Sequence, residues 1–128
     1  MAKRYRTILV VEDETTLRQV ITRNLEARGH AVLGAETATE ALRHLTGLKP
    51  DLMLLDINLP DRSGWDVLRE LRERGIQVAT VIVSAVRVSP ARLEEFRPLA
   101  YLPKPFPLDA LLRLVASEED EPAPPEVE

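Results

Sequence analysis

The chain has 128 residues, of which 45% are hydrophobic and 30% are charged, a balance typical of one globular domain with a buried core. The net charge of −4 does not favour nucleic acid as the main partner, and the absence of cysteine excludes disulfides and thiolate metal sites. The first apolar run, residues 8–11, is too short for a signal peptide or a membrane span. We therefore expect a soluble cytoplasmic domain with no membrane contact.

Five short apolar runs, rich in aliphatic and β-branched residues, predict β-strands. They cover residues 7–11, 31–33, 52–55, 78–83 and 100–102. Three of these runs show no alternation of polar and apolar residues. Such runs are expected for strands that are covered on both faces in a parallel sheet.

Segments with helical spacing separate the expected strands. The first helix is predicted from four apolar residues and a glycine at its end: Leu17, Val20, Ile21, Leu25 and Gly29. The second is expected to begin at Thr37 and run through Leu45, because Thr37 and Glu40 have the spacing of a capping box.

Three further helices follow in the same alternation with strands. The third has one apolar face and a closing glycine, formed by Trp65, Leu68, Leu71 and Gly75. Ser89 and Pro90 fit the N-cap and first position of a short fourth helix that Pro98 must end. Residues 108–115 predict a fifth helix.

The alternation of strand and helix, repeated five times, predicts a doubly wound α/β domain with a five-stranded parallel sheet and helices on both faces. We place this domain at residues 1–116 and expect residues 117–128 to be a disordered, acidic, proline-rich tail. No glycine-rich phosphate loop of the GxGxxG or GxxxxGK[ST] type is present, which disfavours a dinucleotide or ATP enzyme.

Polar side chains stand at the carboxyl ends of four of the five expected strands. They are Glu12 and Asp13, Asp56, Ser84 and Lys104. In an open α/β sheet these ends form the ligand-binding edge, so three carboxylates converge there if strands one and three are neighbours. Each acid alone could be a turn former or a helix cap, but two carboxylates ~5 Å apart repel by roughly 3 kcal/mol at an effective dielectric constant near 20. The cluster therefore predicts a site for Mg²⁺ (or Mn²⁺).

These residue types suit phosphoryl transfer. Asp56 at a strand tip is placed to act as a nucleophile, while Ser84 and Lys104 can contact phosphoryl oxygens. Taken singly, the serine could be a hydroxyl that bonds to backbone, and the lysine could be a solvated surface residue.

The segments ILVVEDE, LLDINLPDRSGWD, VIVSA and YLPKPF, in this order and spacing, resemble the receiver domain of two-component response regulators across residues 5–116. The resemblance implies a flavodoxin-like receiver fold and a phosphoacceptor signalling switch whose only chemistry is on itself, so we do not expect an enzyme. It also implies two partners. One is a sensor histidine kinase or phosphotransfer protein that donates the phosphoryl group, and the other is a downstream protein or an output domain.

The resemblance assigns a role to each residue of the acidic edge. Asp56 is the implied phosphoacceptor. Asp13 and Asp56 are implied direct ligands of Mg²⁺, together with the backbone carbonyl of Asn58, and Glu12 is expected to reach the metal through water. Lys104 is expected to pair first with the carboxylate and then with the phosphoryl group.

The resemblance also implies a switch. Ser84 occupies the hydroxyl switch position and Tyr101 the aromatic one, so phosphorylation is expected to draw Ser84 inwards and let Tyr101 turn towards the core. Without the resemblance, Tyr101 would be interpreted as an amphipathic residue at the rim of the core. The Lys104–Pro105 bond matches a position that is usually cis in the family.

Some features depart from the family pattern or leave the output open. The stretch from Ser84 to Lys104 looks short, so the use of the fourth helix in dimerisation is an open question, as are the cognate kinase, the signal and the phosphoryl lifetime. We interpret His30 and His44 as solvated surface residues. The chain is either a single-domain regulator or a receiver excised from a longer protein, and no basic recognition helix predicts binding to DNA.

Two alternatives use similar residues. A phosphatase of the haloacid-dehalogenase type also has a strand-tip aspartate, but it needs a second aspartate two positions later as acid and base, where Asn58 stands here. A pseudo-receiver would keep the site residues without being phosphorylated.

Overall fold

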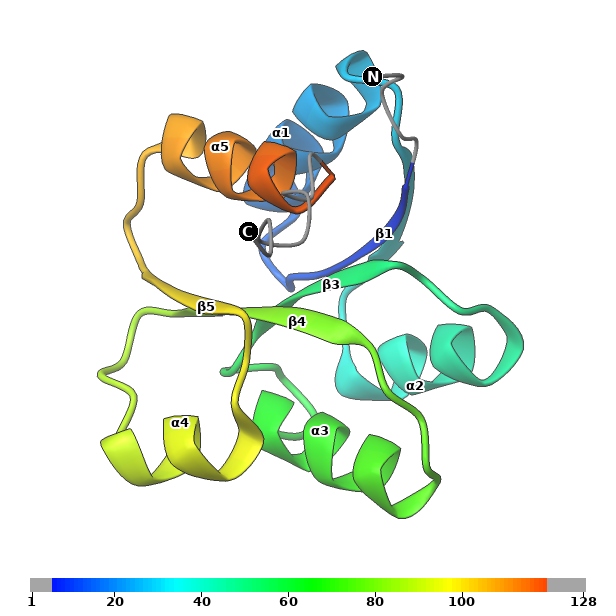
Figure 1. Ribbon diagram of the computed structural model, residues 1–128, viewed down its shortest axis with the longest axis vertical. Coiled ribbons are helices and arrows are strands. Elements are labelled where there is room, and N and C mark those ends of the chain that lie inside the picture. The colour runs from blue at the N-terminus through cyan, green and yellow to red at the C-terminus, as the bar shows by residue number, and fades with distance from the viewer. Residues whose placement is uncertain (1–5, 120–128) are drawn as a thin grey trace, which may run out of the picture.

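The structure, a computed structural model, describes residues 6–119 and contains five strands that alternate with five helices (Figure 1). The elements are β1 (Thr7–Val11), α1 (Thr15–Ala27), β2 (Ala31–Ala35), α2 (Ala38–Gly47), β3 (Leu52–Asp56), α3 (Gly64–Glu73), β4 (Ala79–Ser84), α4 (Pro90–Phe96), β5 (Ala100–Pro103) and α5 (Leu108–Glu119). The strands form one sheet in the order β2-β1-β3-β4-β5, and every neighbouring pair is parallel. The predicted fold class is confirmed.

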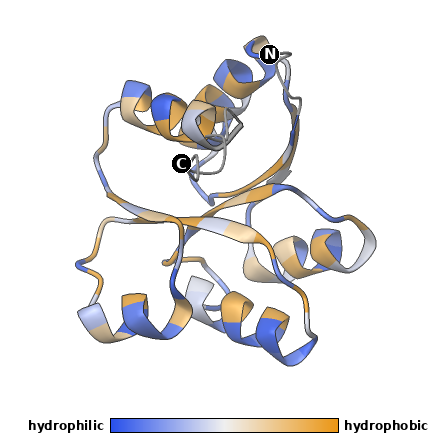
Figure 2. Ribbon diagram, in the orientation of Figure 1, coloured by the Kyte–Doolittle hydropathy of each residue, from blue (hydrophilic) through white to orange (hydrophobic). Residues whose placement is uncertain are grey.

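Helices cover both faces of the sheet. Figure 1 shows α1 and α5 on one face and α2, α3 and α4 on the other. In β1 the side chains alternate between two cores: Ile8 and Val10 pack with α1 and α5, while Leu9 and Val11 pack with α2 and α3. Apolar residues therefore run along the central strands without polar alternation, and polar residues gather on the outer sides of the helices (Figure 2).

The ends of the helices follow local sequence signals. Gly29 and Gly75 have φ angles of 95° and 69°, which glycine adopts without steric cost, and each stands just after a helix as predicted. Helix α4 begins after Ser89, whose Oγ accepts a hydrogen bond from the Arg92 amide at 3.2 Å. Its last residue is Phe96, so the helix has seven residues and is as brief as the flanking prolines predict.

The first helix forms where its apolar spacing predicts it, although Val20 is 38% exposed. Two local predictions were incomplete. The Thr37 hydroxyl does accept the Glu40 amide at 3.0 Å, but the Glu40 carboxylate accepts the Glu36 amide at 2.9 Å, so only half of the expected capping box forms. Helix α5 runs to Glu119, past the expected boundary at residue 116. The rest of the expected tail, residues 120–128, lies outside the described residues.

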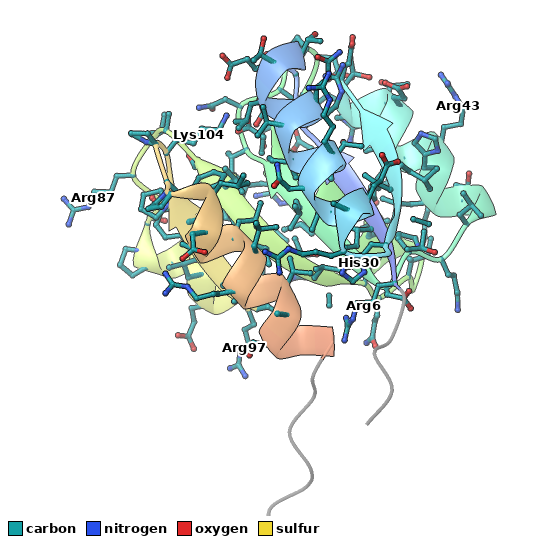
Figure 3. All side chains as sticks on the ribbon, turned by 90° about the horizontal axis from the view of Figure 1, so that it is seen from above. Arg6, His30, Arg43, Arg87, Arg97 and Lys104 are labelled. Carbon is teal, nitrogen blue, oxygen red and sulfur yellow. The ribbon has the colours of Figure 1, made fainter. Side chains whose placement is uncertain are left out.

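The interpretation of His30 as a solvated surface residue was wrong, because it is 5% exposed and lies directly before β2. Its amide donates to the Leu25 carbonyl at 3.2 Å, which folds the chain back after the Gly29 turn, and its Nδ1 accepts the Arg6 amide at 3.3 Å. Figure 3 shows His30 and Arg6 close together and well away from Lys104. His44 is half-buried, with Nε2 3.3 Å from the Gly34 carbonyl oxygen.

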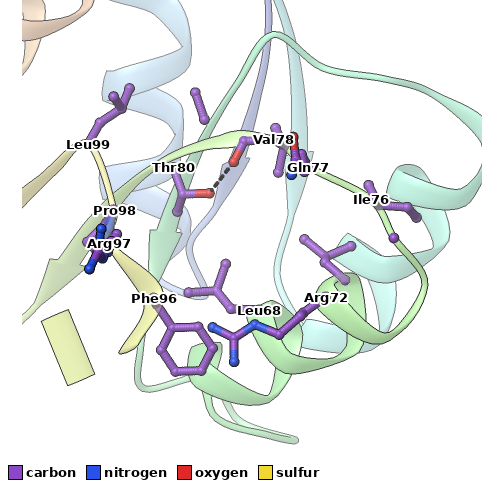
Figure 4. A pocket seen from close by; sticks show the side chains of 13 residues that line it. Leu68, Arg72, Ile76, Gln77, Val78, Thr80, Phe96, Arg97, Pro98 and Leu99 are labelled. Carbon is purple, nitrogen blue, oxygen red and sulfur yellow. Dashed lines mark hydrogen bonds between the residues drawn. The ribbon is translucent and has the colours of Figure 1, made fainter. Parts of the chain in front are cut away.

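A pocket of about 450 Å³ lies between α3, α4 and the amino ends of β4 and β5 (Figure 4). It is lined mainly by apolar side chains, including Leu68, Phe96 and Leu99, with Arg72 beside them. This pocket is at the other end of β4 from Ser84, so it is separate from the acidic edge. Among the described helices, none is long and apolar enough to cross a membrane.

Candidate functional site

The carboxyl ends of β1 and β3 bring three acids together. The two strands are hydrogen-bonded neighbours, with Val11 opposite Leu55. The residues that follow these two, Glu12 and Asp56, therefore lie at the same edge of the sheet. One carboxylate oxygen from each of Glu12, Asp13 and Asp56 lies within 4.8 Å of the other two. Glu12 and Asp56 are each 3% exposed, whereas Asp13 is exposed.

Lys104 joins the two buried acids. Its Nζ lies 2.9 Å from Glu12 Oε1 and 2.9 Å from Asp56 Oδ2. The lysine lies in the loop after β5, where its amide donates to the Ser84 carbonyl at 2.8 Å. The Lys104–Pro105 peptide bond is cis. One ammonium group is therefore shared by two of the three clustered carboxylates.

The loop after Asp56 is folded tightly against the strand. The Asn58 amide donates to Asp56 Oδ1 at 3.1 Å, and the Gly64 amide donates to the Ile57 carbonyl at 2.7 Å. A Cβ at Gly64 would lie 2.6 Å from the Asp56 carbonyl oxygen, closer than real Cβ atoms approach. The Ser63 hydroxyl and the Asp66 carboxylate complete a capping box that starts α3 at this point.

Ser84 lies at the tip of β4 and is 1% exposed. Its hydroxyl donates to the Val86 carbonyl at 2.8 Å and accepts the Val86 amide at 3.0 Å, so it bonds to nearby backbone. Tyr101 is paired with Ile82 across β4 and β5 and packs at the rim of the core beneath α2 and α3.

Comparison with known proteins gives the same assignment as the motifs. A family model described as the response regulator receiver domain matches residues 8–116. The chain belongs to this family. The receiver domain resembles two curated mycobacterial proteins over about half of their length. It is 34% identical over 125 residues to the response regulator MprA of Mycobacterium ulcerans, covering 91% of this chain and 54% of that protein. It is 39% identical over 108 residues to the transcriptional regulatory protein KdpE of Mycobacterium tuberculosis, covering 82% and 47%.

Solved structures resemble the receiver domain over most of its length. The signal receiver domain of a putative Luxo repressor protein from Vibrio parahaemolyticus has a TM-score of 0.81 at 28% identity, covering 91% of this chain and 92% of that one. The response regulator TrrA of Thermotoga maritima, solved in complex with Mg²⁺ and BeF, has a TM-score of 0.75 at 30% identity, covering 86% and 96%.

Burial and charge act against each other in the acidic cluster of the receiver domain. Burial raises the pKa of the Glu12 carboxyl, and the hydrogen bonds from Lys104 and the Glu14 amide oppose this effect without cancelling it. For Lys104, burial lowers the pKa, but the hydrogen bonds to Glu12 and Asp56 outweigh it and raise the pKa above its usual value. The lysine is therefore a fixed positive charge at neutral pH.

The chemistry of the donor set fits Mg²⁺ or Mn²⁺. All the charged ligands that Glu12, Asp13 and Asp56 can offer are carboxylate oxygens, which these hard cations prefer. The backbone carbonyl of Asn58, two residues after Asp56, would add another oxygen. The ends of the predicted strands had indicated the three acids, whereas Asn58 was expected only from the resemblance to receiver domains.

Two residues that connect the loops beside the site to other elements were not predicted. Arg18 in α1 donates from Nη1 to the Glu12 carbonyl at 2.7 Å and pairs through Nη2 with Glu36 at 2.9 Å. Asp61 accepts the Ala38 amide at 2.9 Å and the Thr39 amide at 3.0 Å. Burial raises the pKa of the Asp61 carboxyl, but these hydrogen bonds together outweigh it and hold the pKa well below its usual range. The available sequence signal was the turn-forming run that contains Asp61.

Proposed function

We propose that this receiver domain is a phosphorylation-dependent switch in a two-component or phosphorelay system, with Asp56 as the phosphoacceptor. The observation that carries the proposal is the position of Asp56. Its carboxylate is buried at a strand tip, 2.9 Å from Lys104 Nζ and inside a cluster of two further acids. A carboxylate held in this way is oriented for attack on an incoming phosphorus atom.

The proposed donor is a phosphohistidine on a sensor kinase or phosphotransfer protein. An Asp56 carboxylate oxygen bonds to phosphorus and the bond from phosphorus to the donor imidazole nitrogen breaks, with the electron pair going to that nitrogen. The product on this chain is an acyl phosphate. Lys104 already contacts Asp56 Oδ2, so its ammonium group can follow the transferred charge onto a phosphoryl oxygen.

Glu12, Asp13, Asp56 and the Asn58 carbonyl would hold Mg²⁺ or Mn²⁺ next to the phosphoacceptor, with Glu12 acting through water. When bound, the ion supplies positive charge that offsets the charge on the phosphoryl oxygens in the transition state. The oxygen-only donor set and the likeness to TrrA, which was solved with Mg²⁺ and BeF, support this assignment.

Ser84 and Tyr101 are the proposed switch. The Ser84 hydroxyl donates a hydrogen bond to the Val86 carbonyl and accepts one from the Val86 amide. A phosphoryl group on Asp56 would compete with these two bonds for the hydroxyl. Movement of Ser84 would leave room for Tyr101 to turn inwards and change the surface around β5. The shift is limited by the difference in interaction energy between the two states, and a downstream protein or output domain would detect it.

Intact-mass spectrometry after incubation with acetyl phosphate tests the proposal. One labile phosphoryl adduct is expected with Mg²⁺, much less without it, and none on Asp56→Asn. Asp51→Asn is a matched control because Asp51 flanks the amino end of the same strand, where its carboxylate accepts the Thr7 amide at 2.8 Å. An unmodified protein, with acetyl phosphate and with a phosphorylated kinase, would instead favour a pseudo-receiver.

A further inference from the structure

The loop that joins β3 to α3 carries Asn58, whose carbonyl is a proposed metal ligand. At its base the loop is closed on itself, because Asn58 and Ser63 form an isolated antiparallel bridge and the Gly64 amide donates to Ile57. At the tip of the loop, the carboxylate of Asp61 contacts the beginning of α2. Asp61 is exposed, and its partners in α2 lie 22–23 positions away in the sequence.

Asp61 holds the beginning of α2 with both carboxylate oxygens. Its Oδ1 accepts the Ala38 amide at 2.9 Å, and its Oδ2 accepts the Thr39 amide at 3.0 Å and the Thr39 hydroxyl at 2.8 Å. The first amides of a helix have no partner within the helix, and its positive dipole end favours a carboxylate. The contact is therefore well matched in geometry and in charge, and it ties the loop tip to α2.

The same end of α2 is connected to the loop after β1. Glu36 precedes α2 and accepts from Arg18 Nη2 at 2.9 Å, and Arg18 Nη1 donates to the Glu12 carbonyl at 2.7 Å. The loop after β1, which carries Glu12 and Asp13, and the loop after β3, which carries Asn58, are thus both attached to the segment from Glu36 to Thr39. This segment itself contributes no acid to the cluster.

We propose that Asp61 is a positioning residue for the divalent cation: by anchoring the loop tip on α2, it holds the Asn58 carbonyl where the ion needs it. The inference rests on the proposed function. Mg²⁺ demands nearly ideal octahedral geometry, so a small drift of one ligand weakens binding. Loss of groups that orient metal ligands usually lowers affinity by 10–100-fold, and for Asp61→Ala we expect about tenfold because it acts through the loop.

A simpler role for Asp61 is to cap α2, and Thr37 separates the two roles. The Thr37 hydroxyl accepts the Glu40 amide at 3.0 Å at the same helix end, but Thr37 belongs to the loop before α2. Thr37→Ala therefore removes a cap of α2 and leaves the anchor of the β3–α3 loop in place. Thr39→Val is a milder variant that removes only the hydroxyl bonded to Asp61.

The experiment is an NMR titration of the full chain with Mg²⁺ and, separately, with Ca²⁺, followed through the Asn58 and Glu14 amides. For each variant, hydrogen exchange of the Ala38 and Thr39 amides is measured in the metal-free protein. Urea unfolding gives the stability of the same variant. We expect Asp61→Ala to lose protection at both amides and to bind Mg²⁺ about tenfold more weakly. Ca²⁺ should lose less affinity because it accepts flexible coordination. Thr37→Ala should keep the affinity for both ions, and Thr39→Val should lie between Asp61→Ala and the parent.

If Asp61→Ala and Thr37→Ala weakened Mg²⁺ binding equally, the inference would be overturned, because the stability of α2 would then be the cause. Unchanged Mg²⁺ affinity in a folded Asp61→Ala protein, or in Thr39→Val if Asp61→Ala does not fold, would overturn it as well. Both results require that the parent protein binds Mg²⁺. If the parent does not bind the ion, the proposed metal site itself fails, and the inference fails with it.

Discussion

Gly64 packs directly on the backbone of Asp56, so that a β-carbon at Gly64 would lie 2.6 Å from the Asp56 carbonyl oxygen and 3.0 Å from the Ile57 Cα. Gly64→Ala must therefore displace the strand tip or the start of α3. We expect a loss of about 1–3 kcal/mol in the free energy of unfolding, as in other overpacked sites. Phosphorylation of Asp56 by acetyl phosphate should slow at the same time, because the displaced backbone is that of the proposed nucleophile.

Urea denaturation measures the stability, and the rate of adduct formation by mass spectrometry measures the chemistry. Gly47→Ala is the matched control, since a Cβ at the end of α2 meets nothing within 4 Å. It should be neutral or stabilising by up to about 1 kcal/mol. Equal effects of the two substitutions would show that close packing at Gly64 is not the cause.

Lys104→Gln should lower the stability of the metal-free protein. Glu12 and Asp56 would keep their burial but lose the ammonium group that lies 2.9 Å from each. Leaving buried charged groups unpaired costs about 1–3 kcal/mol, and the partial exposure of Lys104 keeps the loss below that of a fully buried pair. Addition of Mg²⁺ should reduce the difference from the parent protein, because the cation offsets the same carboxylates.

Chemical denaturation in EDTA and in excess Mg²⁺ gives the difference in unfolding free energy between Lys104→Gln and the parent protein, without and with the metal. Lys49→Gln removes the same charge from an exposed position and should change stability by less than about 0.5 kcal/mol. A Lys104→Gln protein as stable as Lys49→Gln in EDTA would contradict the prediction.

Glu12→Gln should stabilise the metal-free protein at neutral pH. Burial raises the pKa of Glu12 above its ordinary value of 4.5, so the folded state favours the protonated carboxyl. The favourable contribution of the protonated Glu12 carboxyl to stability is present below pH 4.5 and is lost as the pH rises through the folded-state pKa. Glutamine has no such titration, so the advantage of the variant should be small at pH 4 and grow as the pH rises above 4.5.

Unfolding free energies measured in EDTA at several pH values, for the parent and for Glu12→Gln, give this dependence. Glu14→Gln, at an exposed position two residues later, serves as the reference for a general change in charge. A stability difference that does not vary with pH would show that the carboxyl of Glu12 is not the titrating group.

Phe96→Ala should loosen α4 from α3. The Phe96 ring stacks on Trp65, with ring centroids 5.3 Å apart, and the Arg72 guanidinium lies 4.7 Å from the Phe96 centroid. The stacking and cation–π contacts together are worth about 1–2 kcal/mol, which is the expected loss. Trp65 is the single tryptophan of the chain, so its fluorescence reports the change directly.

Urea unfolding followed by this fluorescence measures the loss. Leu99→Ala is a suitable comparison, because Leu99 lines the same pocket and is 46% exposed. Its effect should stay below that of Phe96→Ala. An unchanged emission spectrum of folded Phe96→Ala would argue against the stacked contact.

The places where prediction failed share one cause. His30 was interpreted as a solvated surface residue but is buried directly before β2. Glu40 has the spacing of a capping box, yet its carboxylate bonds to the Glu36 amide. In each case the local pattern allowed more than one arrangement, and contacts with neighbouring elements selected one of them.

The sequence by itself determined the alternation of strands and helices and the polar residues at the tips of four of the five strands. Hydrophobic periodicity, glycine after α1 and α3, and the cap at Ser89 are local signals, and they need no knowledge of distant contacts. The rule that parallel strands present their carboxyl ends at one edge then placed Asp56 and Lys104 at a common site.

Only the tertiary structure decided how that site is held. It places β1 beside β3, buries Glu12 and leaves Asp13 exposed, and sets Lys104 between two acids, one of which is 48 residues away. It also brings Asp61 to the start of α2. These contacts join loops that are far apart along the chain, and their geometry depends on how the whole sheet and its helices pack, which no local pattern encodes.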